Sequence, residues 1–311
     1  MDITNKKIIC YGEMLADLFG SIQEGFIPKF GGAPVNTAVG LAKLGLSNVY
    51  FLGMIGQDFF GDFLKEKMIS YGVNPDYLLQ TTQKNTTLAF VSLASDGQRS
   101  FSFSRGAHEI ISQKDLESFD FSNVALLHFG SLTQTNDICF NATKYLIAQA
   151  KQNKTILSYD PNVRLALWEN KEKLKNIILE TAKQVDILKI SNDELEFLTG
   201  EKELEAGSKK IWSDNLKLLF ITLGKDGAFW KSQTSSGIVA TKQYNVVDTT
   251  GAGDAFNAGI IYQLTQLADN DLNISDENVV KAVEFANMVA GLSTQKKGAV
   301  DSLPTKQELG L

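Results

Sequence analysis

Residues 248–261 constrain the chemistry of this 311-residue chain more than any other stretch. They follow the β-branched pair Val246-Val247 and read Asp-Thr-Thr-Gly-Ala-Gly-Asp-Ala-Phe-Asn-Ala-Gly-Ile-Ile. Spaced apolar residues begin at Phe256, so the pattern predicts a strand, a glycine loop and the start of a helix. The first turn of a helix has unpaired N–H groups and the positive end of the helix dipole, which together favour a bound phosphate.

The glycines of this loop and the acid that follows them predict a kinase. Gly251 and Gly253 allow the backbone amides of the turn, including that of Ala252, to approach an anion closely. Asp254 places a carboxylate where a phosphate would sit, and its charge opposes simple phosphate binding. A carboxylate at that position suits a general base that takes a proton from an attacking hydroxyl. The local alternative is an ordinary helix start with an acid favoured by the dipole.

The composition is typical of a soluble enzyme. Apolar residues make up 43% of the chain, enough for one large α/β domain, and the net charge of -6 offers no basic surface for nucleic acid. No apolar run is long enough to span a bilayer and no signal-peptide cleavage pattern is present, so the default expectation is a cytoplasmic protein. Cys10 lies in a short apolar run, which favours a buried thiol over a disulfide.

Several familiar chemistries lack their motifs. The chain has no Gly-x-x-x-x-Gly-Lys-Ser/Thr loop, no Gly-x-Gly-x-x-Gly after its first strand and no Gly-x-Ser-x-Gly elbow. Its two histidines are His108 and His128, and there is no His-Glu-x-x-His motif. His128 lies in an apolar run, which favours a core residue over a ligand. P-loop, dinucleotide-binding, α/β-hydrolase and zinc chemistry are therefore disfavoured.

Short, nearly continuous apolar runs alternate with helical patterns along most of the chain. This alternation predicts an α/β fold with a mostly parallel central sheet flanked by helices, and catalytic residues at the carboxyl ends of its strands. The predicted strands are Lys7–Tyr11, Val49–Leu52, Ala125–Phe129, Thr155–Tyr159, Ile187–Ile190 and Leu218–Thr222, and the predicted helices cover residues 35–44, 59–70, 136–152, 171–184 and 277–294.

Two segments break this alternation and predict a small separate β-sheet. Thr86–Leu93 has a strand pattern, Asp96-Gly97 is a strong hairpin-turn signal, and residues 100–104 alternate serine with phenylalanine. Met14–Phe19 also has an extended pattern. A sheet outside the main one would serve as a lid or as a dimer surface.

We therefore expect a single domain over residues 1–311, with a lid formed by inserted segments at about 12–30 and 86–106. An exposed apolar face on the lid hairpin, with Phe101 and Phe103, would favour a homodimer through the lid.

A second glycine-rich helix start covers Gly31-Gly32-Ala33-Pro34-Val35-Asn36-Thr37-Ala38, where the proline suits a first helical position. Gly31 and Gly32 let the backbone approach a ligand, and Asn36 offers the donor and the acceptor that polyol hydroxyls require. A purely structural helix cap is the alternative. With this motif and residues 248–261 in this order, the chain resembles the ribokinase-like sugar kinases, also called the phosphofructokinase B-type family, and the fructokinases most. The resemblance extends from Tyr11 to Val300.

This resemblance implies an activity and a set of ligands. The activity is ATP-dependent phosphorylation of a sugar primary hydroxyl, most readily fructose to fructose 6-phosphate, with ATP, Mg²⁺ and in some members K⁺. A 2-keto-3-deoxygluconate kinase, a ribokinase and a nucleoside kinase remain as alternatives. A non-catalytic sugar- or nucleotide-binding protein on the same fold is the alternative from another class. The implied partners are small molecules, with no nucleic acid and no membrane.

The resemblance also implies roles for residues in the sugar site and in phosphoryl transfer. Asp17 would hold sugar hydroxyls, since a carboxylate accepting from them makes a charge-assisted contact; a solvated strand residue is the alternative. Gly31, Gly32 and Asn36 would line the sugar site. Asp254 would be the catalytic base, next to amides from Gly251, Ala252 and Gly253.

Two arginines are implied near the sugar. Asp160-Pro161-Asn162-Val163-Arg164 follows a predicted strand and resembles the Asp-x-Asn-x-Arg element of fructokinases. Arg164 suits phosphoryl oxygens or an acidic substrate, or it pairs with Asp160 and closes the loop. Arg105, at the end of the hairpin, resembles the lid residue that reaches the sugar, although the neighbouring Gly106-Ala107-His108 departs from the usual fructokinase pattern.

The remaining implied residues bind the nucleotide and its metal ions. Ser191-x-x-Glu194 stands where family members often have Asn-x-x-Glu, so that Glu194 would organise Mg²⁺ through water, and the same spacing also fits a capping box. Asp248 and Thr250 match a monovalent-cation site of some members. A plain turn is the local alternative for residues 224–227. The implied nucleotide-binding residues are Lys189, Ser191, Thr222, Gly224, Gly227 and Asn287.

Overall fold

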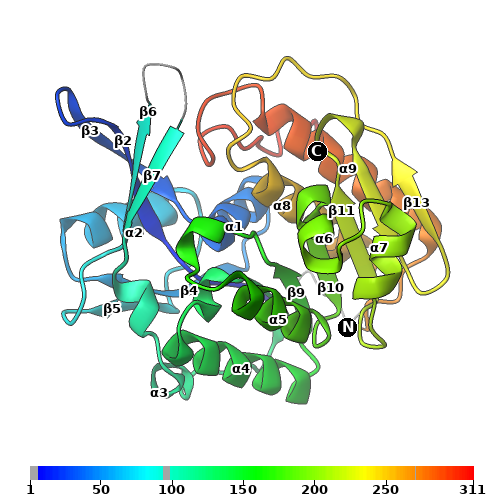
Figure 1. Cartoon of the computed structure of the whole chain (residues 1–311), viewed down its shortest axis with the longest axis horizontal. Coiled ribbons are helices and arrows are strands. Elements are labelled where there is room, and N and C mark those ends of the chain that lie inside the picture. The colour runs from blue at the N-terminus through cyan, green and yellow to red at the C-terminus, as the bar shows by residue number, and fades with distance from the viewer. Residues whose placement is uncertain (1–5, 94–98, 270) are drawn as a thin grey trace.

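A nine-stranded sheet forms the centre of the protein in the computed structural model, which describes residues 6–93, 99–269 and 271–311 (Figure 1). Neighbouring strands from β11 to β5 are parallel, and β12 and β13 extend that edge as antiparallel strands. The order is β13 (Ser236–Val239), β12 (Ala228–Lys231), β11 (Leu218–Thr222), β10 (Ile187–Ser191), β9 (Ile156–Asp160), β8 (Val124–Gly130), β1 (Lys7–Tyr11), β4 (Val49–Gly56) and β5 (Leu78–Thr81).

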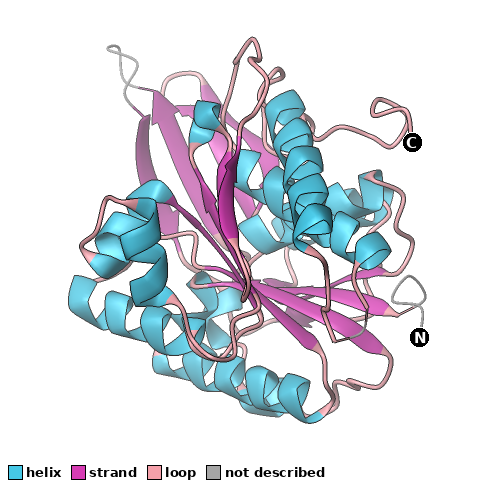
Figure 2. Cartoon of the chain, turned by 90° about the vertical axis from the view of Figure 1, so that its right-hand side faces the viewer, coloured by secondary structure: helices cyan, strands magenta, loops and turns pink. Residues whose placement is uncertain are grey.

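Helices cover both faces of this sheet, as Figure 2 shows edge-on. Side chains of β1 alternate between the two faces: Ile8 and Cys10 belong to one buried cluster, and Ile9 and Tyr11 belong to the other. The first cluster includes α1 (Ala33–Lys43), α2 (Phe59–Ser70), α8 (Ala252–Leu267) and α9 (Asp276–Ser293), and the second includes α3 (Gln113–Leu116), α4 (Asp137–Gln152), α5 (Lys171–Ala182), α6 (Asn192–Thr199) and α7 (Leu204–Ile211).

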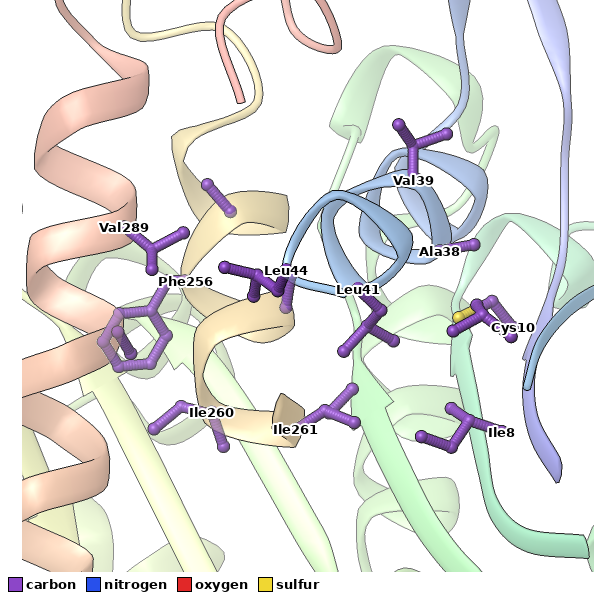
Figure 3. Packing of buried hydrophobic residues seen from close by; sticks show 14 of the residues in the cluster. Ile8, Cys10, Ala38, Val39, Leu41, Leu44, Phe256, Ile260, Ile261 and Val289 are labelled. Carbon is purple, nitrogen blue, oxygen red and sulfur yellow. The ribbon is translucent and has the colours of Figure 1, made fainter. Parts of the chain in front are cut away.

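The packing of α1 against α8 positions the starts of both helices. Leu41 of α1 lies next to Ile261 of α8 (Figure 3), and both belong to the first buried cluster. The helices approach closely at Gly40, because a Cβ added there would lie 2.6 Å from the Cβ of Ala258. Gly40 lies four residues after Asn36, and Ala258 lies four residues after Asp254, so each pair shares one face of its helix. The contact therefore brings the first turns of the two helices together.

A separate four-stranded sheet, the predicted lid, has the order β3 (Gly25–Gly31), β2 (Leu15–Ser21), β6 (Leu88–Leu93) and β7 (Arg99–Ser104). It rises from one side of the main sheet in Figure 1, and β2 pairs in parallel with β6. The predicted hairpin strands and the extended segment near residue 15 are confirmed. The predicted turn at Asp96-Gly97 lies outside the described residues. Phe103 lines a cavity beneath the lid instead of an exposed face, which corrects the prediction made for it.

The strand predicted at Val246-Val247 is wrong. Both side chains are more than half exposed, and residues 240–251 connect β13 to α8 without a strand. The amides of Val247 and Asp248 both donate to the Thr294 carbonyl at the end of α9, which fixes this connection. The β-branched pair predicted a strand, but the segment has no sheet neighbour to pair with among the described residues.

The core predictions for Cys10 and His128 are confirmed. Both residues are buried, and His128 Nδ1 lies 3.0 Å from the hydroxyl of Ser158. Burial lowers the pKa of His128 to about 4, so the ring is neutral. No helix in the described parts of the chain combines the length and the apolar character needed to cross a membrane.

Candidate active site

Two cavities meet at the first turn of α8. The acidic cavity, of about 410 Å³, lies between the strand ends and the lid, and the loop cavity, of about 310 Å³, lies between α8, α9 and the segment after β13. Thr249 and Gly253 line both. The acidic cavity is named for its four carboxyl side chains, Glu13, Asp17, Asp160 and Asp254.

Asp254 lies in the first turn of α8 and is only 7% exposed. The Nδ2 of Asn36, in the first turn of α1, donates to its Oδ2 at 2.8 Å. Burial raises the pKa of Asp254 to about 7, and the charge of Asp160 adds to this shift, whereas Asn36 and the nearby cations oppose it. The predicted base and the predicted sugar-site amide are thus brought together, and the raised pKa of Asp254 lies in the range that suits a proton acceptor near neutral pH.

The α8 start has backbone amides that suit an anion, and the ammonium group of Lys189 on β10 lies beside it. Gly251 adopts a left-handed conformation at the N-cap, and the amide of Ala252 donates to the Thr249 carbonyl at 3.2 Å. Gly253 and Asp254 come next, and their amides have no backbone acceptor among the described residues. A Cβ added at Gly253 would lie 3.0 Å from Lys189 Nζ, so glycine there lets the ammonium approach.

Asp160 and Lys189 form a buried ion pair beside that turn. Asp160 ends β9, and its Oδ2 accepts from Lys189 Nζ at 3.0 Å and from Asn257 Nδ2 at 2.7 Å. Although burial alone would raise the pKa of Asp160, the Lys189 ammonium holds it below its usual value. Lys189 therefore lines the acidic cavity and not the loop cavity where nucleotide binding was expected. The sequence reasoning missed Asn257, which shares a face of α8 with Gly253 at the i, i+4 spacing.

The base of the four-stranded sheet contributes Asp17, the residue predicted to hold sugar hydroxyls, and its side chain lines the acidic cavity. A Cβ added at Gly31 would lie 2.2 Å from Asp17 Oδ2, so this glycine makes room for the carboxylate. Burial raises the pKa of Asp17 to about 6, and Arg164 counteracts it. Gly32 has a φ of 121°, and a Cβ there would lie 2.4 Å from the Glu13 carbonyl. Gly31 and Gly32 therefore admit neighbouring protein atoms, although Gly32 also lines the cavity.

Arg164 and Arg105 differ in their surroundings. Arg164 is exposed, lines the acidic cavity and donates to the Val163 carbonyl at 3.3 Å. The alternative pairing of Arg164 with Asp160 is not formed. Arg105 pairs with Glu109 at 2.8 Å and donates to the carbonyl of Leu167, and it is absent from the described lining of the acidic cavity. It connects the lid base to the segment after Arg164, and its i, i+4 spacing to Glu109 was visible in the sequence.

The loop cavity collects four of the predicted nucleotide-binding residues: Thr222, Gly224, Gly227 and Asn287. Asn287, on α9, donates from Nδ2 to the Val239 carbonyl at 3.0 Å and so anchors the end of β13. Tyr244 and Gly291 also line the loop cavity, and the sequence did not predict them. The ring of Tyr244 packs against Gly291, where an added Cβ would lie 2.0 Å from Tyr244 Cε2.

Ser191 and Glu194 form the capping box that the alternative interpretation predicted, at the start of α6. Glu194 Oε2 accepts from the Ser191 amide at 2.7 Å, and its Oε1 accepts from the Val163 amide at 2.6 Å. The glutamate therefore joins the end of β10 to the loop that carries Arg164. Neither residue belongs to the described lining of the acidic or the loop cavity.

Asp248 and Thr250 fold the segment before α8. Asp248 Oδ1 accepts from the Thr250 amide at 3.0 Å and from its hydroxyl at 2.6 Å, and Asp248 Oδ2 accepts from the Gly298 amide at 3.1 Å. These contacts join the segment before α8 to Gly298. Within the described residues, no group of three or more His, Cys, Asp or Glu side chains is placed to hold a metal ion.

This arrangement suits transfer of a phosphoryl group to a hydroxyl. The Asp254 carboxyl group, with a raised pKa, faces a cavity lined with hydrogen-bonding groups. The helix start beside it lines both cavities through Gly253, and the Lys189 ammonium group lies next to this glycine. The fold and this geometry define a carbohydrate kinase of the ribokinase-like class. The chain belongs to the pfkB family of carbohydrate kinases, whose family model matches residues 5–306.

Similar proteins include plant fructokinases. The chain is 37% identical to the probable fructokinase-6, chloroplastic, of Arabidopsis thaliana over 96% of its own length and 80% of that protein. It is 34% identical to fructokinase-1 of Zea mays over 97% of this chain and 96% of the relative. Both comparisons span the lid, the acidic cavity and the loop cavity.

Solved structures of bacterial fructokinases have the same fold. A fructokinase from Xylella fastidiosa with bound ATP has a TM-score of 0.91 at 32% identity, with 98% of this chain and 97% of that chain covered. A fructokinase double mutant from Vibrio cholerae O395, bound to fructose, ADP and a potassium ion, has a TM-score of 0.88 at 30% identity, with coverage of 98% and 97%.

Proposed function

We propose that this carbohydrate kinase is a fructokinase that converts fructose and ATP to fructose 6-phosphate and ADP. The observation that carries the proposal is Asp254, a buried carboxylate with a pKa raised to about 7 where the two cavities meet. The similar proteins named as fructokinases support fructose as the acceptor.

Asp254 acts in this proposal as the general base. Its carboxylate takes the proton of the primary hydroxyl at C6, and the oxygen then attacks the γ-phosphorus of ATP. The new bond joins O6 to phosphorus, and the bond from phosphorus to the ADP oxygen breaks. The Asn36 amide, 2.8 Å from Asp254 Oδ2, keeps the other carboxylate oxygen directed to the acceptor hydroxyl.

The start of α8 stabilises the charge on the transferring group. The amides of Gly253 and Asp254 have no backbone acceptor among the described residues, so they suit the phosphoryl oxygens. Lys189 Nζ lies beside Gly253 and adds a positive charge at the same place. The amide of Ala252 contributes less in this proposal than the sequence suggested, because it already donates to the Thr249 carbonyl.

Mg²⁺ suits a site in which ATP phosphates and water supply most ligands, since this ion retains several waters and needs few carboxylates. When bound, it neutralises the phosphate charge. Glu194 fits an indirect role, because each carboxylate oxygen accepts one amide and retains a second lone pair for a water. K⁺ would act through the segment held by Asp248 and Thr250, and the potassium ion in the similar Vibrio cholerae fructokinase supports this.

The charges of the acidic cavity favour a neutral sugar. The charge of Lys189 is already balanced by Asp160. Among the described lining residues, Arg164 is then the one cation without a carboxylate partner, so an acidic sugar would be repelled by Glu13 and Asp17 and attracted by Arg164 alone. Arg164 is the observation that keeps 2-keto-3-deoxygluconate as the second candidate.

An acceptor panel tests the proposal. Release of ADP is measured with fructose, 2-keto-3-deoxygluconate, ribose and a nucleoside, and we expect the highest kcat/KM with fructose. Faster turnover of 2-keto-3-deoxygluconate would replace fructose with the second candidate. Binding of sugar without turnover by any nucleotide would indicate a non-catalytic protein.

We also propose a homodimer through the lid. Ile22 and Ile27, at the hairpin of β2 and β3, are 90% and 65% exposed, and burial in a partner would remove this apolar surface from water. Sedimentation of the wild type and of an Ile22→Lys, Ile27→Lys variant tests this. A wild-type monomer would contradict it.

A further inference from the structure

Glu13 is a buried acid of the acidic cavity that the mechanism above does not use. It stands between β1 and β2, is 5% exposed, and lines the cavity together with Asp17 and Asp254. Its Oε1 accepts from the Ala33 amide at 3.1 Å, at the start of α1. Its Oε2 is buried and has no hydrogen-bond partner among the described residues.

Capping α1 does not explain both oxygens of Glu13. Asp58, which caps α2, has both of its oxygens satisfied: Oδ1 accepts from the amides of Phe60 and Gly61, and Oδ2 accepts from the amide of Thr86. A buried carboxylate oxygen without a donor is costly, so a donor from outside the protein chain is the expected partner. In Glu13 the oxygen without a donor is Oε2, and this side chain lines the acidic cavity, which is the proposed site of the sugar.

The surroundings of Glu13 place its carboxyl near the reacting groups. Burial, together with the charge of Asp254, raises its pKa to about 7, whereas the Ala33 amide and Arg164 oppose this shift. Asn36 Oδ1 is a second buried acceptor without a partner among the described residues, and its Nδ2 holds Asp254. Two unsatisfied acceptors beside the base require donors, which the hydroxyls of a polyol supply.

We propose that Glu13 is a sugar-contacting residue whose Oε2 accepts a hydrogen bond from a hydroxyl other than the one that is phosphorylated. This inference rests on the proposed function, and it makes Glu13 a determinant of specificity. A sugar that lacks this hydroxyl leaves a buried carboxylate oxygen without a donor, so it is rejected more strongly than the loss of a surface contact would predict.

The test compares fructose with 1-deoxy-, 3-deoxy- and 4-deoxyfructose in the wild type and in Glu13→Gln. The amide retains the volume of the side chain and an acceptor for the Ala33 amide. One deoxy sugar should lose about 10- to 100-fold in kcat/KM in the wild type, since a hydrogen bond to a charged group has that worth. The same sugar should lose less than about 3-fold in Glu13→Gln, because the charged acceptor is gone.

Asp58→Asn is the matched control, because it changes a capping carboxylate outside both cavities, and it should keep the wild-type pattern with every deoxy sugar. Glu13→Ala, with thermal unfolding measured in parallel, replaces Glu13→Gln if the latter folds poorly. Equal losses for every deoxy sugar in the wild type and in the Glu13 variants would overturn the role of Glu13. If the wild type does not phosphorylate fructose, the proposed function fails, and deoxy analogues of the sugar found by the acceptor panel test Glu13 in the same way.

Discussion

The acidic cavity and the loop cavity share the first turn of α8 but differ in the charge of their lining residues. Four carboxyl side chains line the acidic cavity, whereas the described lining of the loop cavity holds no carboxylate and includes Lys225 and Lys242. Carboxylates accept hydroxyls well and repel phosphates. In the proposed function this difference places the polyol in the acidic cavity and the anionic nucleotide in the loop cavity, with Asp254 next to the turn that the two cavities share.

The strongest test of this division is Asp254→Asn. We expect kcat to fall about 1,000-fold, since a positioned base typically contributes 10²–10⁴-fold. Binding of both ligands should change little, because the asparagine retains the volume and an acceptor for Asn36. The assay is ADP release, with Asp193→Asn in the exposed first turn of α6 as control. Turnover within 10-fold of the wild type would remove Asp254 as the base.

Lys189→Met tests the ammonium group at the meeting point. We expect kcat to fall about 100-fold, because a charge that stabilises the transferring group is lost. The variant should also lose about 3–5 kcal/mol of stability, since Asp160 would remain buried without its cation. Adding Asp160→Asn should restore most of the stability but not the turnover, as urea unfolding and ADP release would show. Restored turnover in the double variant would mean that Lys189 only balances Asp160.

A pair of variants separates the two cavities. Gly291→Ala displaces the Tyr244 ring and should raise the KM for ATP about 10-fold, with the KM for fructose within 2-fold. Asp17→Asn should do the reverse, because it weakens a charge-assisted contact on the sugar side. Initial rates with each substrate varied in turn measure both. A shift of both KM values in either variant would break the division.

A change of pH should have the smallest effect of the four tests. Asp254 would accept a proton only in its ionised form, so kcat/KM should fall as the pH drops through about 7. The folded pKa is raised, so the stability linked to Asp254 is fully present below its ordinary pKa and is lost as the pH rises through 7. Asp254→Asn should therefore gain more Tm over the wild type at pH 8 than at pH 5, by a few degrees. Equal Tm differences at both pH values would contradict the shift.

Much of the fold was predictable because buried parallel strands have their own signature. The runs that predicted β1, β4, β8, β9, β10 and β11 are apolar because helices cover both faces of the sheet. Val246-Val247 has the same residue types without a sheet neighbour, and only the tertiary structure distinguishes the two cases. The antiparallel strands β12 and β13 were missed because their runs are short.

The positions of Asp254 and Asn36 in the candidate site were predictable because glycine and acid patterns mark a helix start. The positions of other residues were not predictable, because tertiary packing alone brings them into the site. Lys189 became a partner of Asp160 only because β9 and β10 are neighbours, and a lone lysine in an apolar run gives no such signal. Glu13 was open to prediction, since it follows the end of β1 almost directly, at the edge of the sheet where active sites gather.

The most direct measurement is phosphorus NMR of the products that the wild type forms from fructose and ATP. Transfer at the α8 start between the two cavities predicts one sugar phosphate, esterified at C6, in an amount equal to the ADP released. Release of inorganic phosphate in place of a sugar phosphate, or esterification at C1, would contradict the placement of the acceptor hydroxyl at Asp254.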